Sequence, residues 1–110
     1  MKVAAVVSDL MLFSRIESAA STAGAALVRL DDPSALPPDV DLVLVDWSAR
    51  EATWAAPLSA ARHAGSRVIL FGPHVDLDAH AAAREAGLGP MRARSSSAAV
   101  LARELAGQTA

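Results

Sequence analysis

Two carboxylates in this chain follow apolar runs and are placed where they could bind a cation. Asp46 ends the run Leu42–Val45, and Asp9 follows Val3–Val7 with only Ser8 between them. Such unbroken apolar runs are typical of central strands in a parallel sheet, and open α/β sheets bind ligands at the carboxyl ends of those strands. On neighbouring strands the two carboxylates would repel each other, and a divalent cation that prefers oxygen ligands, such as Mg²⁺, would relieve the repulsion.

A simpler interpretation of the same residues stays open, in which Asp9 only caps a helix and Asp46 is a solvated loop carboxylate. Other site chemistry has little support in the sequence. The chain has no Cys, which excludes disulfides and thiolate metal sites. His63, His74 and His80 lack a spacing typical of a metal site, and no glycine-rich nucleotide-binding motif occurs.

Composition limits the class of protein. The 110 residues are 53% hydrophobic and 20% charged, which is typical of a single globular domain spanning 1–110. The formal net charge of −2 gives no electrostatic reason to expect nucleic-acid binding. The apolar start, Met1–Val7, is shorter than a usual signal-peptide core, and no long apolar span follows. We therefore expect a cytoplasmic protein with no membrane partner.

Strand and helix patterns alternate along the chain, and this alternation would position the two carboxylates. Strands are expected at residues 3–7, 25–30, 42–46 and 67–71, with a weaker one at 90–94. Helical periodicity follows four of them, and an Ala-Gly pair ends three of the helices at Gly24, Gly65 and Gly87. The pattern predicts an α/β/α three-layer sandwich of the flavodoxin-like type, with a five-stranded parallel sheet in the order 2-1-3-4-5. Leu10 and Leu77 are assigned to the buried stripes of their helices.

The connection at residues 31–40 departs from this rhythm, because it holds three prolines in barely the length of a crossover. The helix between the second and third strands should be shortened or missing. Val28, Leu30, Leu36 and Leu42 would then be partly open and would favour self-association, with a twofold homodimer as the default, or docking of another protein. In the alternative, Leu36 packs inward and the protein is a monomer.

The chain resembles the CheY-like receiver domain of two-component response regulators over nearly its whole length. The resemblance lies in Ser8-Asp9 after the first strand, Asp46 after the third, and Ala86-Gly87 before the last. It implies that Asp46 accepts a phosphoryl group from a histidine kinase. It also implies that an acidic pair after the first strand binds Mg²⁺, that a Thr or Ser ends the fourth strand, and that a Lys ends the fifth.

The sequence departs from the receiver pattern at several of these positions. Asp9 and Asp46 remain as metal ligands, but Ser8 replaces the second acid, so Mg²⁺ binding is expected to be weak. Gly72 stands where the hydroxyl residue belongs. Arg94 takes the Lys position and is expected to pair with Asp46 or with a phosphate. The resemblance is therefore to an atypical receiver, also called a pseudo-receiver.

Three functions follow as hypotheses. The first is a stand-alone atypical receiver, not an enzyme, that acts as a protein-interaction module in signalling. The second is a phosphorylatable receiver in a two-component phosphorelay, with Asp46 as acceptor and a histidine kinase or another signalling protein as partner. The third is an unrelated flavodoxin-like protein that binds a small ligand at the same edge. Trp54 is assigned to the core, whereas Trp47, beside an aspartate, is expected to be a partly exposed contact residue.

Overall fold

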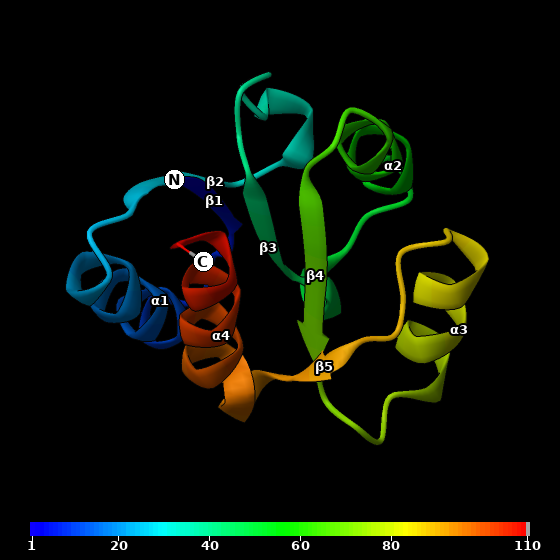
Figure 1. Cartoon of the computed structure of the whole chain (residues 1–110). Helices are drawn as coiled ribbons and strands as arrows, with labels where there is room; N and C mark the ends of the chain where they lie inside the picture. The colour runs from blue at the N-terminus through cyan, green and yellow to red at the C-terminus, as the bar shows by residue number, and fades with distance from the viewer. Residues whose placement is uncertain (110) are drawn as a thin grey trace.

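A computed structural model describes the backbone of residues 1–109 and the side chains of residues 1–93 and 95–105. Its five parallel strands form one sheet in the order β2-β1-β3-β4-β5, which confirms the predicted topology (Figure 1). The strands are β1 (Lys2–Val6), β2 (Ala26–Leu30), β3 (Leu42–Asp46), β4 (Arg67–Gly72) and β5 (Arg92–Ala93).

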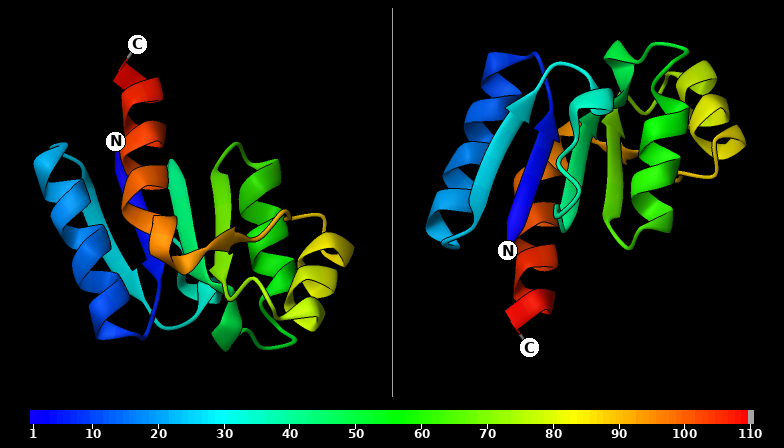
Figure 2. Two further views of the ribbon diagram at one scale, coloured as in Figure 1. Left: turned by 90° about the horizontal axis from the view of Figure 1, so that it is seen from below. Right: turned by 90° about the horizontal axis from the view of Figure 1, so that it is seen from above.

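Helices cover both faces of the sheet and complete the predicted three layers (Figure 2). The α-helices are α1 (Leu10–Thr22), α2 (Ala55–His63), α3 (Leu77–Glu85) and α4 (Ser97–Thr109). Helices α1 and α4 pack together on one face, and α2 and α3 lie on the other. Three short 3₁₀ helices complete the described part of the chain: η1 (Pro33–Ala35), η2 (Trp47–Ala49) and η3 (Arg94–Ser96). No helix among the described residues is long and apolar enough to cross a bilayer.

The central strands contribute side chains to two hydrophobic cores, because successive side chains of a strand point to opposite faces. Leu42 and Leu44 of β3 pack on the α1–α4 side, and Val43 and Val45 pack on the α2–α3 side. All four are fully buried, as the apolar run predicted. Each buried Val or Leu side chain contributes about 1.5–3 kcal/mol, so the strand that ends at Asp46 is anchored from both faces.

The connection between β2 and β3 is an irregular strap with the single turn η1, so the predicted loss of a helix is confirmed. Val28, Leu30 and Leu36 are half-buried against the α2–α3 core, as expected. The expectation for Leu42 was wrong: it is fully buried, because its side chain points to the α1–α4 side and away from the strap.

Strand β5 is shorter than predicted and covers only one end of β4. Arg92 pairs with Phe71, and Ala93 pairs with Gly72. The first four residues of β4, 67–70, have β3 on one side, and no strand of the described chain on the other. Figure 1 shows β5 crossing only the carboxyl end of β4. The sheet therefore keeps an open edge along residues 67–70 of β4.

Candidate functional site

Asp46 is the last residue of β3 and lies at the carboxyl edge of the sheet, as predicted. It pairs with Phe71 of β4, and the preceding residue, Val45, pairs with Val6 of β1. Its side chain is only 4% exposed, so the interpretation as a solvated loop carboxylate was wrong. The Ser48 hydroxyl donates a 2.5 Å hydrogen bond to Oδ1 of Asp46. A buried carboxylate requires such donors, because burial otherwise strongly disfavours the charged form.

Ser48 was missed in the sequence analysis, although a signal for it exists. A hydroxyl two residues after an aspartate is a common arrangement in turns, where short polar side chains bond to nearby groups. In this chain the turn is η2, which begins directly after Asp46. Ser48 is exposed while Asp46 is buried, so the hydroxyl that bonds to the carboxylate belongs to a residue that solvent reaches.

Asp9 caps α1, as the simpler interpretation proposed. Its Oδ1 accepts hydrogen bonds from the backbone N–H groups of Met11 at 2.9 Å and Leu12 at 3.1 Å. Val7 follows Val6, the partner of Val45, so the chain leaves β1 beside Asp46 and reaches Asp9 two residues later. The two aspartates thus belong to neighbouring strand ends. Among the described residues no group of three or more His, Cys, Asp or Glu could hold a metal ion.

Gly72 ends β4 one residue beyond the partner of Asp46, so it lies at the same edge. The space beside it is filled. A Cβ built on Gly72 would lie 2.5 Å from Sδ and 3.0 Å from Cε of Met91, a side chain that is only 7% exposed. A hydroxyl residue at this position would have to displace Met91. The sequence showed the missing hydroxyl but gave no sign of this contact, which joins residues from different strand ends.

Arg94 follows Ala93, the partner of Gly72, so its backbone begins η3 at the carboxyl edge. The side chain of Arg94 lies outside the described part of the structure. Its pairing with Asp46 or with a phosphate therefore stays a prediction.

Trp47 is not the contact residue that was expected, because it is 2% exposed. Its indole Nε1–H donates a 3.0 Å hydrogen bond to the Ala79 carbonyl of α3, and the Arg50 guanidinium lies 5.8 Å from the ring centroid. The residue after Asp46 thus ties the end of β3 to α3. Trp54 is buried in the α2–α3 core, as predicted.

Four large apolar side chains at this edge are exposed to solvent. Leu10 and Met11 begin α1 after β1, and Val75 and Leu77 follow β4; each is 71–87% exposed. We call these four residues the apolar rim. The assignment of Leu10 and Leu77 to buried stripes was wrong. Both stand at the first position of a helix, and α3 instead buries the smaller residues Ala79 and Ala83.

Comparison with known proteins shows the fold. No protein-family model matches the sequence, and no curated protein matches it either. Among solved structures, the chain is similar to the crystal structure of a response regulator receiver domain protein from Clostridium thermocellum. The TM-score is 0.67 at 12% sequence identity, over 98% of this chain and 95% of that one. The protein therefore has the CheY-like receiver fold, which confirms the resemblance seen in the sequence.

Proposed function

We propose that this protein is an atypical receiver domain, a single domain over residues 1–110, that works in signalling by binding another protein and not as an enzyme. The observation that carries the proposal is the apolar rim at the carboxyl edge. The four side chains lie in two pairs, one after β1 and one after β4, at the edge where open α/β sheets bind their ligands. A signalling protein in the cytoplasm is the proposed partner, and the receiver fold makes a histidine kinase the first candidate.

The rim could support a transient complex. Full burial of a Leu, Met or Val side chain contributes about 1.5–3 kcal/mol, and association itself costs several kcal/mol. In a complex the four side chains would be only partly buried, so the free energy that they contribute would exceed the cost of association by little. We therefore expect weak, exchangeable binding, which is suitable for signalling.

Gly72 and Met91 support the atypical assignment. A receiver that relays phosphorylation through a hydroxyl at the end of β4 needs a side chain there, and Met91 fills that space. A ligand shifts a conformational equilibrium only through contacts that differ between the two states. Without a hydroxyl at position 72, this contact to a phosphoryl group is missing, so the response to phosphorylation should be blunted.

A phosphorylatable receiver is the second candidate, favoured by the position of Asp46 at the end of a central strand. In this reaction an Asp46 oxygen would attack the phosphorus of a phosphohistidine. The P–N bond would break, and the imidazole would regain a proton. Mg²⁺ would bind through Asp9 and Asp46 and would shield the developing charge. The donors fit only a weakly held ion that keeps most of its waters, because Ser8 is neutral and Oδ1 of Asp9 already accepts two backbone hydrogen bonds.

Intact-mass analysis after incubation with acetyl phosphate and Mg²⁺ separates these two functions. The leading proposal expects no stoichiometric gain of one phosphoryl group. A gain that Asp46→Asn abolishes would establish the second candidate.

Affinity capture with the protein of residues 1–110 as bait tests whether the apolar rim binds a partner. A variant with serine at Leu10, Met11, Val75 and Leu77 should lose a signalling partner that the wild type retains. The control is a variant with serine at two exposed alanines of the opposite edge, Ala26 and Ala64. Equal capture by all three proteins would contradict the role of the rim.

The predicted homodimer remains a separate proposal. It rests on Val28, Leu30 and Leu36, which are half-buried on the strap side of the sheet. Sedimentation of the wild type at high concentration should show a dimer, and Leu36→Asp should shift it to monomer. A wild type that stays monomeric removes the proposal.

A further inference from the structure

A second surface lies along the open edge of β4, residues 67–70. The Arg67 N–H donates to the Asp41 carbonyl on the β3 side, at 2.9 Å. Backbone polar groups alternate sides along a strand, so the N–H and C=O of Val68 point to the open side. Strand edges with free backbone groups are templates for the addition of another strand. Arg67 and Gly72 are five residues apart, about 17 Å at about 3.3 Å per residue, so the amino end of this surface is well separated from the carboxyl edge.

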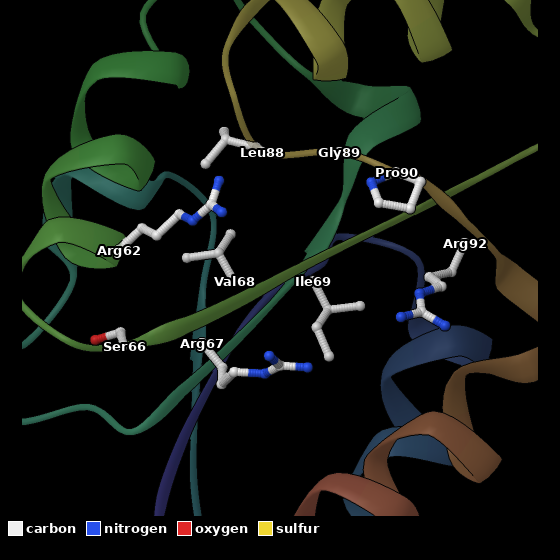
Figure 3. Close-up of a pocket in the computed structure, with 9 residues that line it drawn as sticks. All are labelled: Arg62, Ser66, Arg67, Val68, Ile69, Leu88, Gly89, Pro90 and Arg92. Carbon is white, nitrogen blue, oxygen red and sulfur yellow. The ribbon is translucent and has the colours of Figure 1, made fainter.

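A cavity of about 220 Å³ lies beside this open edge (Figure 3). The first residues of β4 form one wall, and the connection from α3 to β5, Leu88–Pro90, forms another. Arg62, Arg67 and Arg92 also line it. A second cavity of about 420 Å³ shares Arg62 and the Gly89-Pro90 segment. The open edge therefore lies in a groove and not on a flat surface.

The groove is strongly positive in a chain whose net charge is −2. The second cavity adds Arg84 and His80, so four arginines among the described side chains line the two cavities. No Asp or Glu among the described side chains lines either cavity. One carboxylate does reach a lining arginine, since Glu104 of α4 pairs with Arg67 at 2.6 Å. The remaining excess of positive charge would attract an acidic partner and repel a basic one.

The arginines are divided between the two faces of β4, which argues against a single small anion as the ligand. Arg92 is the register partner of Phe71, and Arg67 lies two residues before Ile69, so both arginines are on the α1–α4 side. Arg62 belongs to α2 on the opposite side, where its guanidinium donates to the Gly87 carbonyl. Figure 3 shows Arg67 and Arg92 on one side of β4 and Arg62 on the other. One phosphate could not contact all three, whereas an extended chain beside β4 could.

We propose that the open edge of β4 binds an extended acidic segment of a partner protein by strand addition. Alternate side chains of the added strand would face opposite sides of the sheet. Acidic residues at one set of positions would meet Arg67 and Arg92. Apolar residues at the intervening positions would pack near Val68 and Leu88, and Arg62 would border them. The backbone of the segment would bond to the N–H and C=O of Val68.

Fluorescence anisotropy with the full chain and a fluorescein-labelled peptide of alternating Glu and Val tests the proposal. Saturable binding that weakens with added salt is expected. Arg67→Gln and Arg92→Gln should each weaken it about two- to fivefold, the effect of removing one partly exposed ion pair. Arg15→Gln, on an exposed site of α1, is the matched control and should change nothing.

Backbone chemistry separates strand addition from simple charge attraction. A peptide of the same sequence with N-methylated backbone amides keeps its charge but cannot form the ladder, so its binding should be lost. Val68→Pro removes the N–H that faces the open side, at an edge position where proline is tolerated. It should weaken binding of the unmethylated peptide while the circular dichroism of the protein stays unchanged. Equal binding of the N-methylated peptide, or competition by inorganic phosphate at similar affinity, would overturn the proposal in favour of a small-anion site. A salt-sensitive dimer of the protein that the peptide dissociates would overturn it in favour of a second copy as occupant.

Discussion

Replacing Gly72 with threonine should destabilise the protein through one contact. The backbone at Gly72 is not left-handed, in contrast to Gly24, Gly65 and Gly87, so the conformation itself accepts any residue. The obstacle is Met91, whose Sδ would lie 2.5 Å from the new Cβ. Carbon and sulfur atoms in ordinary contact are about 3.5–4.0 Å apart, so Met91 must move by about 1 Å or more.

The size of the effect follows from the packing of Met91. This side chain is buried in the α2–α3 core, and overpacking in a core costs about 1–3 kcal/mol. Met91→Ala alone should cost about 2–5 kcal/mol because it leaves a cavity. In the double variant the threonine side chain enters that cavity. The double variant should therefore be more stable than the sum of the single effects by roughly 1–3 kcal/mol.

Urea unfolding of the wild type, both single variants and the double variant measures this coupling. Met91→Leu conserves volume and serves as the control, since combining it with Gly72→Thr should give little relief. Additivity of the two single effects within about 0.5 kcal/mol would refute the argument that Met91 occupies the space at position 72.

The double variant also tests the function proposed for this edge. It places a hydroxyl at the end of β4 with room to move. Amide shifts on adding a beryllofluoride phosphate mimic should then extend from position 72 into β5, whereas the wild type should respond only near Asp46. A wild-type response that reaches β5 would show that another relay exists.

Three further predictions concern other contacts. Ser8→Asp adds a charge beside Asp9 and should strengthen Mg²⁺ binding in calorimetric titration; tight wild-type binding at micromolar metal would contradict the weak site. Trp47→Phe removes the indole hydrogen bond to the Ala79 carbonyl, which keeps its bond within the helix, and should cost about 0.5–1.5 kcal/mol in urea unfolding. The backbone and side chain of Ser34 hold the pKa of Asp32 below its ordinary value of 3.8. Ionised Asp32 therefore stabilises the fold above pH 3.8, and this stability is lost as the pH falls through the lowered pKa. Asp32→Asn should flatten that acid dependence.

The order of the sheet was predictable because it depends on local patterns. Apolar runs marked the buried strands, and three of the helices end at glycines with positive φ, where left-handed backbone favours glycine. The three prolines of residues 31–40 correctly indicated a missing helix. Each of these signals acts within a few residues along the chain.

The positions that were predicted wrongly or not at all depend on which side chains meet across the fold. Trp47 was placed by its neighbour Asp46, but it is buried in the α2–α3 core and bonds to the Ala79 carbonyl, 32 residues further along. Leu77 was assigned to the core by periodicity, yet Ala79 and Ala83 of the same helix face the sheet. Met91 gave no signal as a neighbour of Gly72, because the contact depends on how the chain enters β5. Contacts of this kind require the three-dimensional arrangement.

Met91 lies between Gly72 at the carboxyl edge and the groove beside β4, and this position gives a further test. The residue precedes β5 directly and packs beside Gly72, and it also lines the 420 Å³ cavity next to the open edge of β4. A side chain at position 72 would push Met91 away from the carboxyl edge, toward that cavity and the groove. Gly72→Thr should therefore weaken binding of the acidic peptide although no arginine has changed, and Met91→Ala in the same chain should restore it. If neither substitution changes the affinity for the peptide, the carboxyl edge and the groove are independent and Met91 acts only in packing.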